Sequence, residues 1–145
     1  MKVHFPRKLA AEFRKTARSG FPKERYAILL GAANGASVHI DMLFIPDTQE
    51  YWAKESHICV PNGWWDKAEQ MANQFELKIV GDLHSHCANP KLTLDCSPSE
   101  KDWEHASEVG PVHGVMTLQK HASGRITSKV RFWPSDIEKV ETRVT

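Results

Sequence analysis

The sequence predicts an α/β protein, a single three-layer domain in which helices flank a central mixed β-sheet. The chain has 145 residues, 41% of them hydrophobic and 26% charged, which is typical of one compact domain. Segments with helical periodicity alternate with short runs rich in Ile, Leu, Val and Phe. No repeat, low-complexity tract or Pro/Gly-rich linker divides the chain, so we expect one domain over residues 1–145.

The first 46 residues predict a helix followed by a β-hairpin. Apolar residues recur every four positions between residues 6 and 19, and Gly20 ends this amphipathic helix. Residues 25–31 and 37–46 are rich in large apolar residues, and the Asn-Gly pair between them tolerates the positive φ of a tight turn. We therefore expect two antiparallel strands there.

The next segment predicts a surface loop followed by a second helix. Residues 47–61 mix aromatic and charged residues without a clean period, and we expect a surface loop there with one short strand near 57–60. Asn62 is a suitable N-cap for a helix that packs on the sheet through an apolar stripe. That stripe consists of Trp65, Ala68, Met71, Ala72 and Phe75.

The second half of the chain predicts a strand, a third helix and another hairpin. Residues 77–86 predict the strand, and the Ser-Pro-Ser-Glu sequence that begins at Ser97 starts a helix that extends to about residue 109. Residues 113–119 and 125–133 flank a Ser-Gly turn and predict the hairpin. We expect a short C-terminal helix from Pro134 onward.

Charge and cysteine content exclude several classes of protein. Lys and Arg number 19 against 18 Asp and Glu, so the net charge of +1 predicts no nucleic acid and no anionic membrane as a partner. The longest apolar stretch, Tyr26–Ala33, is too short to span a bilayer, and the basic N-terminus lacks an apolar signal core, so we expect a cytoplasmic protein. Three cysteines without a Cys-x-x-Cys pair provide neither a disulfide framework nor an all-cysteine zinc site.

Two histidines at the end of the strand predicted over 77–86 form the candidate site. Residues two apart on a strand face the same side, so Asp82, His84 and His86 stand in one row. A catalytic zinc site has three protein ligands and an open position, so a carboxylate must join the two imidazoles. Asp82 and Asp102 compete for this role; Asp102 comes from a separate element and shares a helix face with Ser99. The alternative is that the histidines only form hydrogen bonds and Ser99 only caps its helix.

The His-Ser-His motif at 84–86, followed by Ser99 and Asp102, resembles the His-x-His…Ser-x-x-Asp signature of the MPN/JAMM (JAB-domain) zinc-metalloprotease family. Residues 22–31 resemble the family segment in which a catalytic glutamate precedes the first core strand, and Glu24 occupies the matching position. The order of elements agrees across nearly the whole chain, and the short chain is similar to the compact prokaryotic stand-alone type. The resemblance implies the JAB/MPN fold, which is similar to that of cytidine deaminases.

The resemblance implies a zinc-dependent hydrolase of peptide or isopeptide bonds. It implies that His84, His86 and Asp102 hold a Zn²⁺ ion that activates a water molecule. It assigns Glu24 as the general base and Ser99 as a hydroxyl group that stabilises the oxyanion. By likeness to relatives, the substrate is the extended C-terminal tail of a ubiquitin-like protein or of its conjugate, laid along a sheet edge, and an activating-enzyme system is a further expected partner.

Two features depart from the family pattern. Twelve residues, from Cys87 to Pro98, separate the second histidine from the serine, which is longer than the usual spacing. The resulting loop either gates access to the metal or is a passive surface loop. Cys87 stands where the family usually has proline. It is either a small space filler or an extra thiolate at the metal.

Rival functions use some of the same residues. A non-catalytic MPN scaffold would share the fold, but such members have typically lost metal ligands, whereas this sequence keeps every motif position. A cysteine hydrolase would use Cys59 or Cys87 with a nearby histidine, and it would be inactivated by alkylation rather than by chelation. A zinc deaminase is disfavoured because neither His-x-Glu nor Pro-Cys-x-x-Cys is present.

Overall fold

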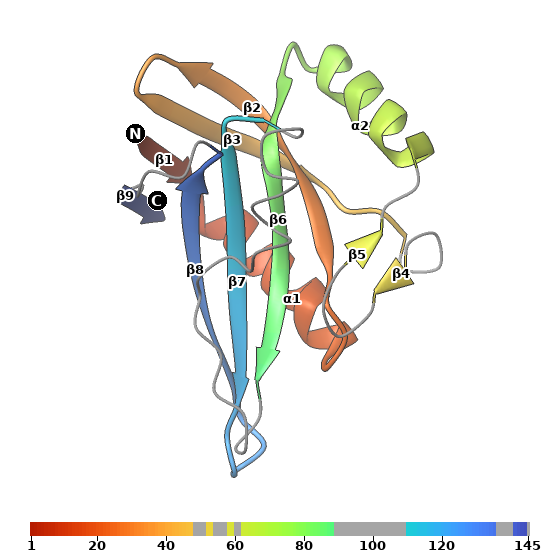
Figure 1. The fold of residues 1–145 in the computed structure, drawn as a ribbon, viewed down its shortest axis with the longest axis vertical. Helices are drawn as coiled ribbons and strands as arrows, with labels where there is room; N and C mark the ends of the chain where they lie inside the picture. The colour runs from red at the N-terminus through yellow and green to blue at the C-terminus, as the bar shows by residue number, and fades with distance from the viewer. Residues whose placement is uncertain (48–51, 54–57, 60–61, 89–109, 136–140, 145) are drawn as a thin grey trace.

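The computed structural model describes residues 1–47, 52–53, 58–59, 62–88, 110–135 and 141–144. Its elements, in chain order, are β1 (Lys2–Phe5), α1 (Arg7–Gly20), β2 (Tyr26–Asn34), β3 (Ser37–Phe44), β4 (Trp52–Ala53), β5 (Ile58–Cys59), α2 (Asn62–Gln74), β6 (Lys78–Ala88), β7 (Val112–Lys120), β8 (Ile126–Pro134) and β9 (Glu141–Val144). Within these residues, seven strands form one sheet in the order β8-β7-β6-β2-β3-β1-β9, and β4 and β5 form a separate ribbon (Figure 1).

The seven-stranded sheet is mixed, as predicted. β2 is antiparallel to both β3 and β6, and β7 is antiparallel to β8. β1 is parallel to β3 and to β9, and β6 is parallel to β7. The carboxyl half of β6 therefore lies between the start of β2 and the body of β7.

Helices cover both faces of this sheet. Successive residues of a strand point to opposite faces, and β2 shows the consequence directly. Ala27 and Leu29 belong to the core that contains α1, whereas Ile28 and Leu30 belong to the core that contains α2. All four side chains are fully buried. The predicted three-layer α/β architecture is therefore confirmed.

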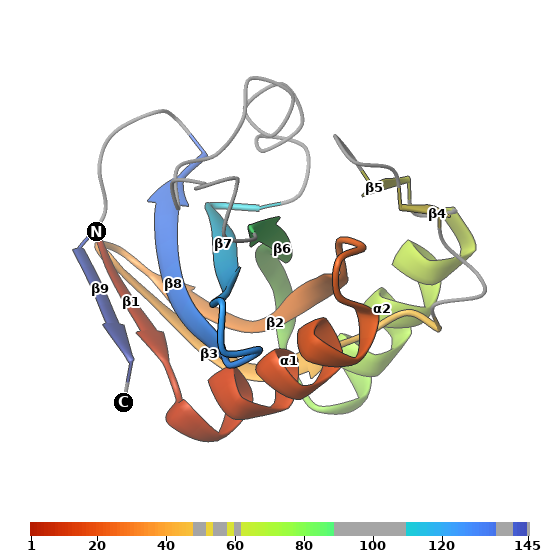
Figure 2. The ribbon, with the colours of Figure 1, turned by 90° about the horizontal axis from the view of Figure 1, so that it is seen from below.

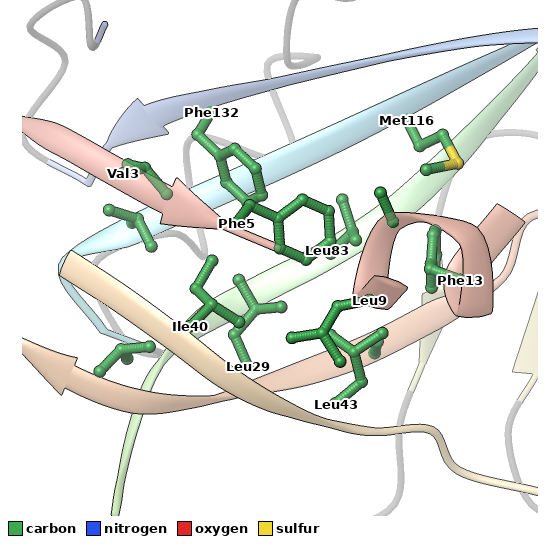
Figure 3. Close-up of a cluster of buried hydrophobic side chains, with 14 of the residues drawn as sticks. Val3, Phe5, Leu9, Phe13, Leu29, Ile40, Leu43, Leu83, Met116 and Phe132 are labelled. Carbon is green, nitrogen blue, oxygen red and sulfur yellow. The ribbon is translucent and has the colours of Figure 1, made fainter. Parts of the chain in front are cut away.

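The sheet curls around α1 (Figure 2). Phe5 of β1 and Phe132 of β8 pack edge to face with ring centroids 5.2 Å apart, although four strands separate β1 from β8 in the sheet order. Figure 3 shows the two rings together, with Leu9 and Phe13 of α1 in the same cluster. Burying each such side chain stabilises the fold by about 1.5–3 kcal/mol. This core fixes the strands that carry the candidate site.

Most of the locally encoded elements match their predictions. α1 buries the predicted residues of its apolar face, and both predicted hairpins are present, with Gly35 at φ +57° and Gly124 at φ +87° in their turns. The short strand expected near 57–60 corresponds to β5. The helix predicted over 97–109 lies outside the described residues. Neither α1 nor α2 is long and apolar enough to cross a membrane.

Three details differ from the sequence prediction. Phe75 is 56% exposed, because α2 ends at Gln74 and Glu76 turns the chain with a positive φ of 57°. Pro134 ends β8, and residues 141–144 form β9, an unpredicted strand that pairs with β1; residues 136–140, where the short C-terminal helix was expected, lie outside the described residues. β1 itself was not predicted, because four residues are too few to establish a period, and its pairing with β3 joins distant parts of the chain.

Candidate metal centre

β6 brings His84 and His86 together near its carboxyl end. Their Nε2 atoms are 2.9 Å apart, and their ring centroids are 4.8 Å apart with the planes inclined by 60°. The alternation of β6 places both side chains on the face that α2 covers, and the burial of each ring differs: His84 is 5% exposed, whereas His86 is only partly buried. The two imidazoles are therefore an inner, buried ring and an outer, partly exposed ring on one face of β6.

The separation of the two nitrogens fits a shared metal ion. Two imidazole nitrogens bound to a tetrahedral zinc ion at ~2.05 Å lie ~3.3 Å apart. The observed 2.9 Å is that of a hydrogen bond in which one ring donates and the other accepts. The separation differs by about 0.4 Å from that of two imidazole ligands on a tetrahedral zinc ion. Thr117, the β7 residue paired with His86, adds a buried hydroxyl oxygen that has no hydrogen-bond partner among the described residues.

Asp82 begins the same row but is engaged elsewhere. Tyr26 Oη donates a hydrogen bond to Asp82 Oδ2 at 2.8 Å, and His113 Nδ1 pairs with Asp82 Oδ1. All three side chains are buried, with exposed fractions of 7%, 6% and 3% for Tyr26, Asp82 and His113. Both carboxylate oxygens of Asp82 thus accept hydrogen bonds from neighbouring strands, whereas Asp102, the other candidate for the third ligand, lies outside the described residues.

Burial and the neighbouring carboxylate also act on Tyr26. Desolvation is the larger cause and the negative charge of Asp82 the second, and together they raise the pKa of the Tyr26 hydroxyl well above its usual value. The hydroxyl therefore stays protonated and remains a hydrogen-bond donor. Sequence reasoning missed the roles of Tyr26 and His113, because only the pairing of β2, β6 and β7 reveals that they flank Asp82.

Glu24 lies two residues before β2, which begins at Tyr26. Two hydrogen bonds hold this part of the chain against β6: Arg25 N–H donates to Ser85 Oγ at 2.8 Å, and Ser85 N–H donates to the Arg25 carbonyl at 3.0 Å. The Glu24 carboxylate is close enough to Cys87 to raise the pKa of its thiol. The structure thus places Glu24 beside the end of the strand that carries His84 and His86.

Cys87 has the properties of a space filler. Burial, and secondly the charge of Glu24, raise the pKa of its thiol to about 11, so the thiol is neutral near pH 7. The side chain packs at the margin of the α1 core, on the opposite face of β6 from the two histidines. These observations disfavour Cys87 as a nucleophile or as an additional metal ligand.

Asp102 and Ser99 lie outside the described residues, as does the predicted loop from position 89 onward. Within the described part of the chain, no three His, Cys, Asp or Glu side chains are grouped so that they could hold a metal. His84, His86 and Glu24 are therefore the members of the predicted site that the structure brings to one end of β6.

Comparisons with known proteins agree with this architecture. A family model, described as prokaryotic homologs of the JAB domain, matches residues 6–135. A Desulfitobacterium hafniense protein, known from a solution structure, aligns with 100% of this chain and 94% of its own, with a TM-score of 0.65 and 18% identity. A JAB1/MPN domain protein from Archaeoglobus fulgidus, known from a crystal structure, aligns over 99% and 98%, with a TM-score of 0.56 and 23% identity. At these identities the likeness concerns the fold. No curated protein is detectably similar in sequence.

Proposed function

The chain belongs to the prokaryotic JAB-domain family, and on that premise we propose that it is a zinc-dependent peptidase or isopeptidase that cleaves after the C-terminal tail of ubiquitin-like proteins. The observation that carries the proposal is the approach of His84 Nε2 and His86 Nε2 to 2.9 Å near the carboxyl end of β6. Two imidazoles and a nearby carboxylate are the residue types that a catalytic zinc site and its base require.

We assign three residues to the metal in this proposal: His84, His86 and Asp102. When bound, zinc acts as a Lewis acid that polarises the scissile carbonyl and lowers the pKa of a water molecule. His84 supplies the buried ligand and His86 the more exposed one. This arrangement leaves the outer side of the site for substrate.

The chain's own residues move the proton and bind the developing charge. Glu24 accepts the proton of the attacking water and passes it to the leaving amine, a role that contributes typically 10²- to 10⁴-fold to the rate. The Ser99 hydroxyl donates a hydrogen bond to the oxyanion. The hydrogen bonds between Arg25 and Ser85 hold the residue that follows Glu24 against β6, which supports a role for Glu24 at this end of the strand.

The substrate class rests on the resemblance to relatives that act on ubiquitin-like proteins. An extended tail can bind by adding a strand to a sheet edge, where main-chain hydrogen bonds provide affinity and side-chain pockets provide specificity. The expected partner is an activating-enzyme system, which prepares such a tail for attachment to a target. The proposed activity would either remove an attached tail or expose the tail of a precursor for that system.

Metal content and cleavage together test this function. We expect about one zinc ion per chain, and we expect cleavage of a reporter fused behind the flexible C-terminus of a ubiquitin-like protein. Glu24→Gln should keep zinc and lose most of the cleavage, whereas Glu69→Gln, at an exposed position on α2, is the matched control that should change neither. A protein that never binds zinc above trace amounts would contradict the proposal. A protein that binds zinc and cleaves no fusion would instead be the non-catalytic scaffold.

A further inference from the structure

A buried series of side chains lies directly behind His84. Tyr26 of β2 donates to one oxygen of Asp82 at 2.8 Å, and His113 of β7 pairs with the other. The His113 ring in turn packs against the His84 ring, with centroids 5.1 Å apart and planes inclined by 40°. The series therefore connects three neighbouring strands to the inner member of the histidine pair.

The burial of this series gives it a defined geometry. A carboxylate that is 6% exposed must have its oxygens satisfied by protein donors, and Asp82 has one on each oxygen. The pairing through Nδ1 fixes the plane of the His113 imidazole, because the ring cannot turn without breaking that bond. His113 is itself only 3% exposed, so neighbouring atoms also restrict it.

A fixed His113 restricts its neighbour. The ring of His84 contacts that of His113 on the inner side and that of His86 on the outer side. Rotation of the His84 ring about its Cβ–Cγ bond would turn Nε2 away from His86, and it would change the packing against the His113 ring at a centroid distance of 5.1 Å. The packing of His113 therefore keeps His84 Nε2 directed at the position that a shared metal would occupy.

We propose that Asp82 and His113 are positioning residues for the zinc centre, which they serve by holding the His84 ring. Neither contacts the metal in this proposal, which rests on the function proposed above. Groups that orient metal-binding histidines commonly change metal affinity by about 10- to 100-fold when they are removed. Here the orientation is transmitted by ring packing rather than by a hydrogen bond to the ligand itself.

Two substitutions of His113 separate the parts of the series. His113→Asn keeps an amide N–H that can donate to Asp82 but removes the ring that packs on His84. His113→Phe keeps a ring but removes the donor that fixes its plane. If both links are needed, each variant should bind zinc about 10- to 100-fold more weakly than the parent in competition with a chromogenic chelator.

The matched control is Met116→Ala. Met116 lies on the same strand as His113, is 1% exposed and packs in the α1 core, on the opposite face of the sheet. This variant should lose stability to unfolding, as a core truncation does, while its zinc affinity stays within about twofold of the parent, well inside the change expected for a positioning residue. Thermal unfolding of each metal-free variant identifies any that does not fold, and Asp82→Asn then serves as the milder change.

A second readout does not require zinc. In protein labelled at histidine, the ring resonances of metal-free His84 should show one orientation with contacts to His113 in the parent, and averaging between orientations in His113→Asn. Folded His113 variants with parental zinc affinity would overturn the proposal, as would an unchanged His84 ring in the metal-free protein. A parent that binds no zinc would refute the proposed function instead, and the ring resonances would still decide whether His113 positions His84.

Discussion

Replacing Tyr26 by phenylalanine removes a single oxygen atom from the buried network. The ring itself should stay in place, because it packs edge to face on Trp65 of α2 with centroids 6.0 Å apart. The lost interaction is the 2.8 Å hydrogen bond from Tyr26 Oη to Asp82 Oδ2. Both residues are almost fully buried, at 7% and 6% exposed, so water is poorly placed to replace the donor.

The expected loss follows from the chemistry of that bond. A hydrogen bond to a charged group contributes about 1.5–3 kcal/mol to the free energy of unfolding. Removing the donor also leaves a buried acceptor without its partner, which is why the loss should not be smaller than this range. We therefore expect the free energy of unfolding of Tyr26→Phe to fall by about 1.5–3 kcal/mol near pH 7. For a chain of this length, that loss corresponds to a decrease in Tm of about 3–12 °C.

The pH dependence of this difference provides a sharper test. The pKa of Tyr26 is raised in the folded protein, so above pH ~10 the unfolded chain loses a proton that the folded chain retains. Stability of the parent must therefore fall as the pH rises through that range, by up to about 1.4 kcal/mol per pH unit, while Tyr26→Phe lacks this contribution. The difference between the two proteins should be largest below pH ~10 and should shrink above it.

Urea unfolding of both proteins between about pH 7 and pH 11 measures this difference directly. The slope of the free energy against urea should be the same for both, because the surface exposed on unfolding is unchanged. Equal stability of the two proteins near neutral pH would refute the assigned hydrogen bond. A difference that stays constant to the alkaline end of the range would refute the raised pKa of Tyr26.

Further predictions concern Cys87, Gly114 and the metal. The thiol of Cys87 has a pKa of about 11 rather than 9.0. In the metal-free protein at pH ~8 it should therefore react with iodoacetamide about 100-fold more slowly than a free thiol, as followed by peptide mass mapping. Rapid alkylation would contradict its burial. Gly114→Ala should lower the free energy of unfolding by about 1–3 kcal/mol, because the added Cβ would lie 2.5 Å from the Phe132 ring; Gly63→Ala, where the methyl group meets nothing within 4 Å, should show no such loss. Removal of zinc by a chelator should abolish cleavage and its return should restore it, whereas cleavage that survives chelation and is lost on alkylation would indicate a cysteine hydrolase.

Local patterns predicted the parts of the fold that depend on short stretches of chain. The turn at Gly35 and the alternation of β2 and β6 are encoded within a few residues, so the first hairpin and the row of His84 and His86 could be predicted. β1 and β9 could not, since their pairing joins the two ends of the chain. Glu24 is one of several glutamates by composition, and only the resemblance to a family selected it.

The partners of Asp82 show why the residues around the two histidines could not be predicted from the sequence. Tyr26 and His113 are separated from Asp82 by 56 and 31 positions, and the three meet only because β6 pairs with β2 on one side and with β7 on the other. The register sets which residues meet: Tyr26 lies opposite His84, and Asp82 lies opposite His113.

Register, then, links the fold to the candidate chemistry. A slip of one residue between β6 and either neighbour would move that neighbour's facing side chains to the opposite side of the sheet. Gly81 helps to prevent such a slip between β6 and β7. A Cβ at position 81 would lie 2.0 Å from the Val112 carbonyl oxygen, so the two backbones can approach this closely only where β6 has glycine. A slip would bring a residue with a side chain to this place. Gly81 directly precedes Asp82, and Val112 directly precedes His113. The close approach of Gly81 and Val112 therefore fixes the register at which Asp82 meets His113. In the proposal above, His113 orients His84, so the geometry of the two zinc-binding histidines depends on this backbone contact.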